Sequence, residues 1–164
     1  MNRVPEQARL LELDQMGASA AVAGGAQCAT PSLLVIDDDN LHRMIICRCG
    51  AKAGYAPAGA ATFEEAVKLT QKTEFDCVTL DLSLGAHVGI EVLHHLQAIG
   101  CKTPIIIISG CDDLTCQESV KLAKLLDLNV WQSIPKPVDL AVLRYWLERL
   151  RTERAAAAGA AVAA

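Results

Sequence analysis

The sequence predicts an α/β domain built on a doubly wound, five-stranded parallel sheet. Five short apolar runs alternate with five segments of helical periodicity. Most of these runs are apolar throughout, and the longest is the region Ile105–Ile108. Strands of this kind are covered by helices on both faces, so they belong in a parallel sheet with right-handed crossovers.

The elements follow in a regular order. We expect strands over 33–36, 55–60, 75–81, 104–109 and 129–134, and helices over 40–53, 63–71, 88–99, about 113–126 and 138–151. Asp39 or Asn40 is expected to cap the first helix, and Thr62 with Glu65 predicts a capping box. Gly100 is expected as the C-cap of the third helix.

The length and composition indicate one domain with tails. The chain has 164 residues, of which 52% are apolar, enough for a substantial core. Residues 1–31 are expected to be a flexible or partly helical extension, 32–151 the domain, and 152–164 an alanine-rich tail.

Charge and cysteine content exclude several classes of protein. The net charge is −4 without a basic block, which argues against direct nucleic-acid binding. No apolar run is long enough to cross a membrane, and no secretory signal is seen. The seven cysteines are irregularly spaced and form no CxxC pair, so reduced thiols and a cytoplasmic location are expected.

Polar residues gather where the predicted strands end. In a parallel sheet these ends share one edge, where ligands bind. The residues are Asp37, Asp38 and Asp39 after the first strand, Asp81 at the third, Ser109 at the fourth and Lys136 after the fifth.

This set of side chains predicts a site for phosphoryl chemistry. Several carboxylates crowded together require a cation among them. Since no histidine or cysteine is expected nearby, the oxygen ligands favour Mg²⁺. A metal, a lysine and a hydroxyl around a nucleophilic aspartate suit the transfer of a phosphoryl group.

The motifs LLVIDDDN, CVTLDLSLGAHVGIEVL, PIIIISG and IPKP resemble those of receiver domains of two-component response regulators, over residues 33–150. The resemblance implies a flavodoxin-like fold with strand order 2-1-3-4-5. It also implies that Asp81 accepts phosphate from a phosphohistidine, supplied by a histidine kinase or a histidine phosphotransfer protein. Such a domain signals to a downstream protein partner, here unidentified, and the resemblance leaves a homodimer of the phosphorylated form open. It is not an enzyme beyond catalysing its own phosphorylation and dephosphorylation.

The resemblance also implies a role for each site residue. Asp37 and Asp38 would be the acid pair, with Asp38 a direct Mg²⁺ ligand, and Asp81 and the backbone carbonyl of Ser83 would complete the metal site. Ser109 would take the switch position, Lys136 would pair with the phosphoryl group, and the Lys136–Pro137 peptide bond would be cis.

The chain departs from the usual receiver pattern mainly in the expected readout. Ser133 occupies the position that usually carries a switch tyrosine or phenylalanine. Gly85 stands where proline is usual, Val88 where aspartate is frequent, and Val138 where phenylalanine is frequent. Trp131 is expected to pack in the core. These departures put the switching mechanism in question and leave the phosphoryl chemistry intact.

Two alternatives stay open. One is a pseudo-receiver, an interaction module that phosphate does not switch, which Ser133 favours. The other is a haloacid-dehalogenase-like phosphatase, with Asp37 as nucleophile and Asp39 as general acid, although its usual later acidic pair is missing. A loose likeness of DLSLG and IIIISG to receivers joined to cyclic-di-GMP phosphodiesterase domains leaves a longer regulator open.

Three other polar residues are expected to have structural roles only. His94 and His95 are adjacent and therefore point in different directions on a helix, so both are expected to face solvent. Arg43 lies close to the acidic cluster in the sequence and is expected to balance its charge.

Overall fold

A computed structural model describes residues 30–82, 85–110 and 120–162. Within these ranges the chain forms a five-stranded parallel sheet with strand order β2-β1-β3-β4-β5. The strands are β1 (Ser32–Ile36), β2 (Ala56–Ala60), β3 (Cys77–Asp81), β4 (Ile105–Ser109) and β5 (Val130–Pro135). The predicted fold class and strand order are therefore confirmed.

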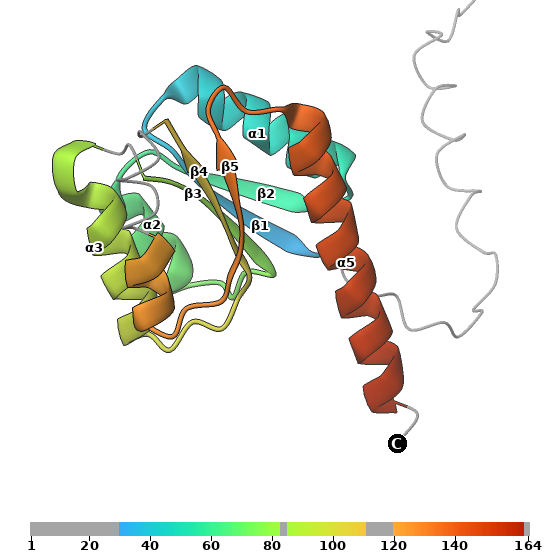
Figure 1. Cartoon of the computed structure of the whole chain (residues 1–164). Coiled ribbons are helices and arrows are strands. Elements are labelled where there is room, and N and C mark those ends of the chain that lie inside the picture. Colours follow the sequence, from blue (N-terminus) through green and yellow to red (C-terminus); the bar gives the residue numbers. More distant parts are fainter. Residues whose placement is uncertain (1–29, 83–84, 111–119, 163–164) are drawn as a thin grey trace, which may run out of the picture.

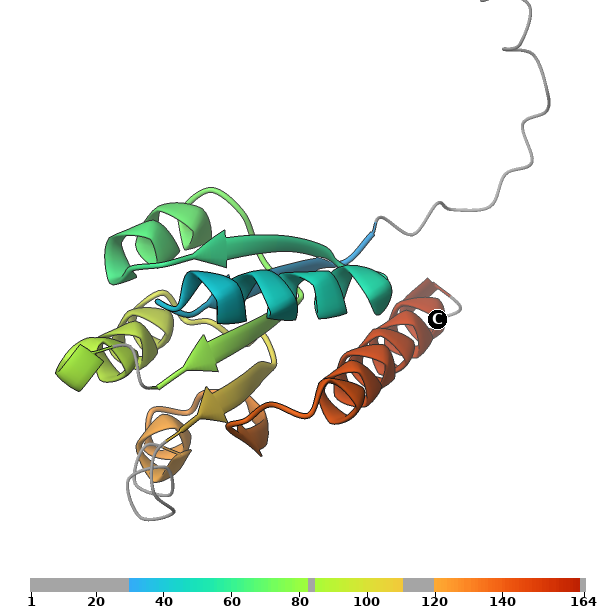
Figure 2. The ribbon, with the colours of Figure 1, turned by 90° about the horizontal axis from the view of Figure 1, so that it is seen from above.

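Helices cover both faces of this sheet (Figure 1). The helix α1 (Asn40–Lys52) and the helix α5 (Leu140–Val162) lie on one face, and α2 (Phe63–Thr70) and α3 (Gly85–Ala98) lie on the other. A further helical segment, residues 120–125, lies beside α3. The view from above in Figure 2 shows the same three layers, with the sheet between the helices.

The sheet separates two apolar cores, as the apolar strands require. Leu34, Ile36 and Leu80 face α2 and α3, whereas Leu33, Val35 and Cys77 face α1 and α5. All six side chains are at most 1% exposed. Because successive strand residues alternate between the cores, burial on both faces fixes the register of each strand.

The predicted caps of α1, α2 and α3 are confirmed. Asp39 accepts a hydrogen bond from the amide of His42 and caps α1. At α2 the amide of Glu65 donates to Thr62, and the carboxylate of Glu65 accepts from the amide of Ala61. After α3, Gly100 has a φ of +67°, a conformation that glycine adopts without a steric penalty.

The boundaries of two helices, α3 and α5, differ by more than one residue from those predicted. The helix α3 begins at Gly85 instead of 88, although the segment before Val88 has no apolar periodicity. The helix α5 begins at Leu140, since Asp139 accepts from the amide of Ala141, and it continues past residue 151 to Val162. The expected caps Asp112 and Asp113 lie outside the described residues.

The strand β5 carries an irregularity beside Trp131. Ile105 pairs with Val130 but Ile106 pairs with Gln132, so the pairing skips Trp131. Trp131 is half-buried against the core under α1 and α5, which confirms its predicted packing role. Ser133 pairs with Ile107, whose side chain lies in the core on the other face of the sheet, under α2 and α3. Because paired residues of parallel strands point to the same face, Ser133 lies toward α3 and residues 120–125.

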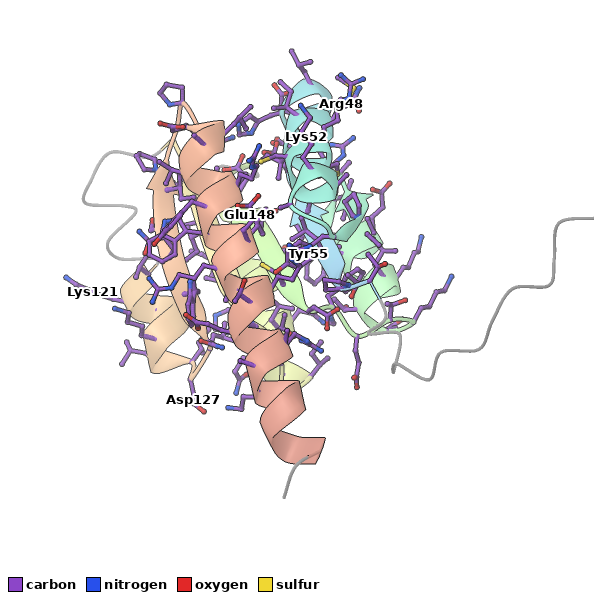
Figure 3. The ribbon with its side chains drawn as sticks, turned by 90° about the vertical axis from the view of Figure 1, so that its right-hand side faces the viewer. Arg48, Lys52, Tyr55, Lys121, Asp127 and Glu148 are labelled. Carbon is purple, nitrogen blue, oxygen red and sulfur yellow. The ribbon has the colours of Figure 1, made fainter. Side chains whose placement is uncertain are left out.

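Two of the polar contacts between the helix α5 and the rest of the domain lie in its middle and in its extension. The buried hydroxyl of Tyr55 donates to the carbonyl of Leu147 at 3.0 Å (Figure 3). Arg154 forms an ion pair with Asp76, whose carboxylate also accepts from the amide of Ser32 at 2.6 Å. The extension of α5 is therefore tied to the amino-terminal edge of the sheet, opposite the edge where the site residues gather.

We expect Tyr55→Phe to lower the free energy of unfolding by about 1 kcal/mol at neutral pH, since one buried hydrogen bond is lost. Burial, with nearby Cys77 and Asp76, raises the pKa of Tyr55. The unfolded phenol ionises near pH 10, so the stabilisation is present below that pH and is lost as pH rises. Urea unfolding of both proteins at pH 7 and above pH 10 should show the difference shrinking, and an equal difference at both values would contradict this account.

Several smaller expectations can also be compared with the structure. No helix among the described residues is long and apolar enough to span a membrane. The cysteines at 47, 49, 77 and 101 are free thiols. His94 is exposed as predicted, but His95 is only half-exposed because its ring contacts Thr70 Oγ1 at 2.9 Å and packs edge-on against Phe63.

Candidate functional site

The predicted site residues meet at the carboxyl-terminal edge of the sheet. Asp37 follows β1, Asp81 ends β3 and Ser109 ends β4. These three side chains are polar yet at most 2% exposed. Lys136 follows β5, and its amide donates to the carbonyl of Ser109 at 2.9 Å. Four of the five strands, β1, β3, β4 and β5, therefore each deliver one polar residue to the same edge, as the parallel topology predicts.

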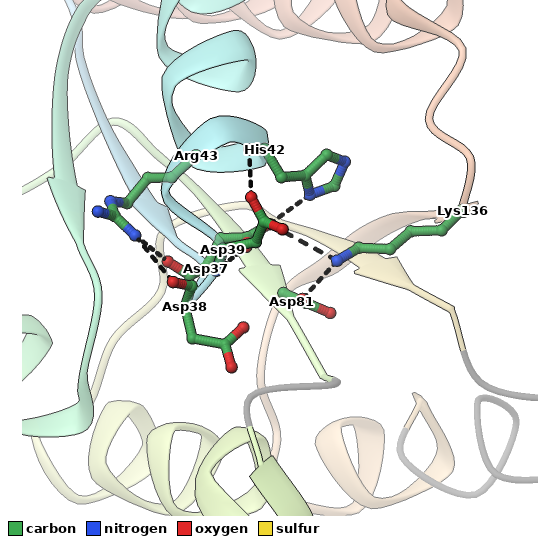
Figure 4. Close-up of polar contacts among 7 residues, drawn as sticks. All are labelled: Asp37, Asp38, Asp39, His42, Arg43, Asp81 and Lys136. Atoms are coloured by element: carbon green, nitrogen blue, oxygen red, sulfur yellow. Dashed lines mark hydrogen bonds and ion pairs between the residues drawn. The ribbon is translucent and has the colours of Figure 1, made fainter.

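Three carboxylates converge there. Asp37, Asp38 and Asp81 each offer an oxygen within 4.8 Å of the others (Figure 4). Asp37 and Asp81 are buried, whereas Asp38 is exposed. Buried like charges at this separation repel strongly, so the cluster requires nearby positive charge.

Lys136 supplies part of that charge. Its Nζ lies 2.6 Å from Oδ2 of Asp81 and 3.7 Å from Oδ2 of Asp37. Burial alone would lower the pKa of Lys136, but the hydrogen bond to Asp81 and the attraction of Asp37 and Asp38 outweigh it and raise that pKa. The lysine is therefore a cation at neutral pH. The Lys136–Pro137 peptide bond that follows is cis, as expected.

A histidine also reaches the cluster, which corrects the expectation that none lies near the acids. His42 Nδ1 lies 2.5 Å from Oδ2 of Asp37 (Figure 4). In the sequence, His42 belongs to the first turn of α1 and does not directly follow a strand. A rule that considers only strand ends therefore misses it. The sequence did carry a signal for this contact. His42 lies three residues after the predicted N-cap Asp39, and a helical side chain at this position leans toward the start of the helix, where the acids lie.

Arg43 supports the acidic loop through its backbone, although the sequence suggested charge balance alone. Its guanidinium donates to the carbonyl of Asp37 at 2.6 Å and to Oδ1 of Asn40 at 3.0 Å. The stem of Arg43 passes over Gly59 in β2, where a Cβ atom would lie 3.1 Å from Arg43 Cδ. Glycine at 59 therefore leaves room for the arginine that holds the loop.

Two further predicted residues have different outcomes. Ser83 lies outside the described residues. Asp39 is exposed, and its carboxylate accepts from the amide of His42 at 2.8 Å, which lowers the pKa of Asp39. This capping role occupies the carboxylate that a dehalogenase-like phosphatase would use as its general acid.

The donor set fits a hard divalent cation. Mg²⁺ prefers oxygen ligands and retains several waters when bound. The three carboxylates supply such oxygens, and the exposure of Asp38 leaves one side of the cluster open to water. The nitrogen of His42 is already engaged with Asp37, so the converging atoms are oxygens. Asp37, Asp38 and Asp81 are the residues that would hold such an ion.

Comparison with known proteins gives a consistent result. A family model of the response regulator receiver domain matches residues 33–148. Response regulator MprA of Mycolicibacterium vanbaalenii is 31% identical over 119 residues, which cover 73% of this chain and 48% of that protein. Regulator of RpoS of Escherichia coli is 26% identical over 113 residues, covering 68% of this chain and 32% of that protein. The chain thus spans half or less of the length of these relatives.

Solved structures agree with the fold. A response regulator from Colwellia psychrerythraea has a TM-score of 0.69 and 25% identity, covering 76% of this chain and 99% of its own. The receiver domain of the Francisella response regulator 1452 has a TM-score of 0.64 and 24% identity, covering 76% and 98%. The match with the latter shows the fold alone.

Proposed function

Because this chain belongs to the response regulator receiver domain family of two-component signalling, we propose that Asp81 accepts a phosphoryl group from a phosphohistidine. The observation that carries this proposal is the ion pair between Lys136 and the buried Asp81, inside a cluster with two more carboxylates. A buried nucleophile beside a fixed cation is the arrangement that phosphoryl transfer requires.

The proposed reaction is a displacement at phosphorus. A carboxylate oxygen of Asp81 forms the new P–O bond while the P–N bond of the phosphohistidine breaks. The electron pair of that bond stays on the imidazole, which takes a proton from solvent. The product is an acyl phosphate on Asp81, and water later hydrolyses it to inorganic phosphate and the free carboxylate.

The residues around Asp81 have separate tasks in this reaction. Lys136 would pair with the phosphoryl oxygens, since its ammonium already lies 2.6 Å from Asp81. Ser109, at the end of β4, would hydrogen-bond a phosphoryl oxygen after transfer. Asp37 and Asp38, with Asp81 and the carbonyl of Ser83, would hold Mg²⁺. That ion, when bound, offsets the negative charge of the phosphoryl group.

The proposed partners follow from this chemistry. The donor would be a histidine kinase or a histidine phosphotransfer protein, and the phosphorylated domain would signal to a downstream protein. A homodimer of the phosphorylated form belongs to the same proposal.

The proposal is tested by intact-protein mass after incubation with acetyl phosphate. We expect a gain of one phosphoryl group that requires Mg²⁺ and disappears with a chelator. Hydroxylamine at neutral pH should remove it, since hydroxylamine cleaves acyl phosphates and leaves phosphoserine intact. No gain in folded, Mg²⁺-binding protein, with acetyl phosphate and with a panel of histidine kinases, would overturn the phosphoacceptor role.

A pseudo-receiver is the second candidate, and Ser133 is the observation that favours it. Ser133 lies in β5 toward α3 and residues 120–125, and it stands where the receiver pattern usually carries a switch aromatic. If phosphorylation occurs without any change in the spectrum of backbone amides in β5 and α5, the protein accepts phosphate but does not use it as a switch.

A further inference from the structure

The contact between His42 and Asp37 has no part in the roles described above. His42 is 22% exposed and Asp37 is 1% exposed, and Nδ1 of the first lies 2.5 Å from Oδ2 of the second. An ionised carboxylate only accepts hydrogen bonds, so when Asp37 is ionised the proton of this contact lies on Nδ1, which donates it. The imidazole thus makes a charge-assisted hydrogen bond to a proposed metal-binding acid.

The start of α1 builds this contact. Asp39 caps the helix by accepting from the amide of His42, which fixes the backbone of His42 in the first turn. Side chains in a helix lean toward its amino terminus. The imidazole of His42 therefore lies back over the loop and meets the side chain of Asp37, five residues earlier.

Both oxygens of Asp37 are consequently held. Oδ1 accepts from the amide of Asp39 at 3.0 Å, and Oδ2 accepts from His42. Arg43 holds the carbonyl of the same residue at 2.6 Å. Each carboxylate oxygen can accept more than one bond, so these contacts fix the orientation of the carboxylate and leave it able to bind a cation or its water.

We infer that His42 is a positioning residue for the divalent-metal site, because it holds the Asp37 carboxylate in the orientation in which the three acids converge. The inference rests on the metal site of the proposed function but does not depend on phosphoryl transfer. Hydrogen-bond partners of metal-binding groups contribute to affinity by restricting those groups before the ion arrives.

Isothermal titration calorimetry with MgCl₂ at a single neutral pH tests this role. We expect His42→Ala to weaken Mg²⁺ affinity by about tenfold, the lower end of the range for lost hydrogen-bond partners of metal ligands. His42→Asn should restore affinity, since its Nδ2 can take the place of the imidazole Nδ1. His42→Gln should not, because its amide lies one carbon farther out. His94→Ala is the matched control, an exposed histidine on α3 that should leave affinity unchanged.

The outcomes separate this inference from the proposed function. A purely structural tie would lower the melting temperature of His42→Ala without changing Mg²⁺ affinity in the folded protein, and that result would overturn the inference. Equal affinities of the Asn and Gln variants would also overturn it, and this comparison holds even if the alanine variant does not fold. Wild type that binds no Mg²⁺ would overturn it as well. Wild type that binds Mg²⁺ but gains no phosphoryl group would overturn only the phosphoacceptor role.

Discussion

Asp81→Asn is expected to abolish the phosphoryl gain from acetyl phosphate. The carboxamide keeps the size of the side chain but removes the nucleophilic oxygen. The rate should fall by at least about 1,000-fold, because losing a nucleophile costs more than losing one stabilising donor. Intact-protein mass over a time course, beside wild type, measures the effect.

The matched control for this substitution is Asp127→Asn. Asp127 is exposed, pairs with Lys102 and lies at the opposite edge of the sheet. Its φ of 55° is one that asparagine also tolerates. The control should be phosphorylated like wild type. Labelling of Asp81→Asn at the wild-type rate would place the acceptor elsewhere, with the exposed Asp38 the first residue to examine.

Lys136→Ala should separate metal binding from phosphoryl transfer. The ammonium contacts Asp81 and Asp37 directly, so it can stabilise charge on a phosphoryl group attached to Asp81. Its loss should slow phosphorylation by about 100-fold, the typical effect of removing one charge-stabilising donor. Mg²⁺ affinity should stay equal or rise, because removing a cation leaves the carboxylates more negative.

Calorimetry with MgCl₂ and the mass time course measure these two quantities on the same variant. Lys102→Ala is the matched control, since Lys102 is 71% exposed and pairs only with the exposed Asp127 among the described contacts. If Lys136→Ala loses Mg²⁺ binding, the lysine acts on the metal site, and the task proposed for it is wrong.

Much of the fold followed from the sequence because its signals are local. Ile105–Ile108 is apolar at every position, which at this short length favours a strand covered on both faces, and Thr62 with Glu65 marks a helix start. The early start of α3 could not be predicted, since Gly85 is a poor helix former and no apolar periodicity precedes Val88.

The residues of the site that lie at the ends of strands could be predicted from the sequence. Asp37, Asp81, Ser109 and Lys136 come together because parallel strands share a carboxyl edge. His42 and Arg43 could not be assigned this way, because their contacts depend on how side chains of the first helical turn fold back over the loop. Such contacts are set by side-chain direction within a helix, and a pattern of residue types does not specify the acceptor.

The passage of Arg43 over Gly59 has an evolutionary consequence. A methyl group at 59 would already crowd the arginine stem, at 3.1 Å from Cδ and 3.4 Å from Cγ. A residue larger than alanine at 59 would press further on this stem, which must shift if Arg43 is to keep its hydrogen bond to the Asp37 carbonyl. The two positions are therefore expected to covary among descendants of this sequence, with glycine at 59 favoured where arginine is kept at 43.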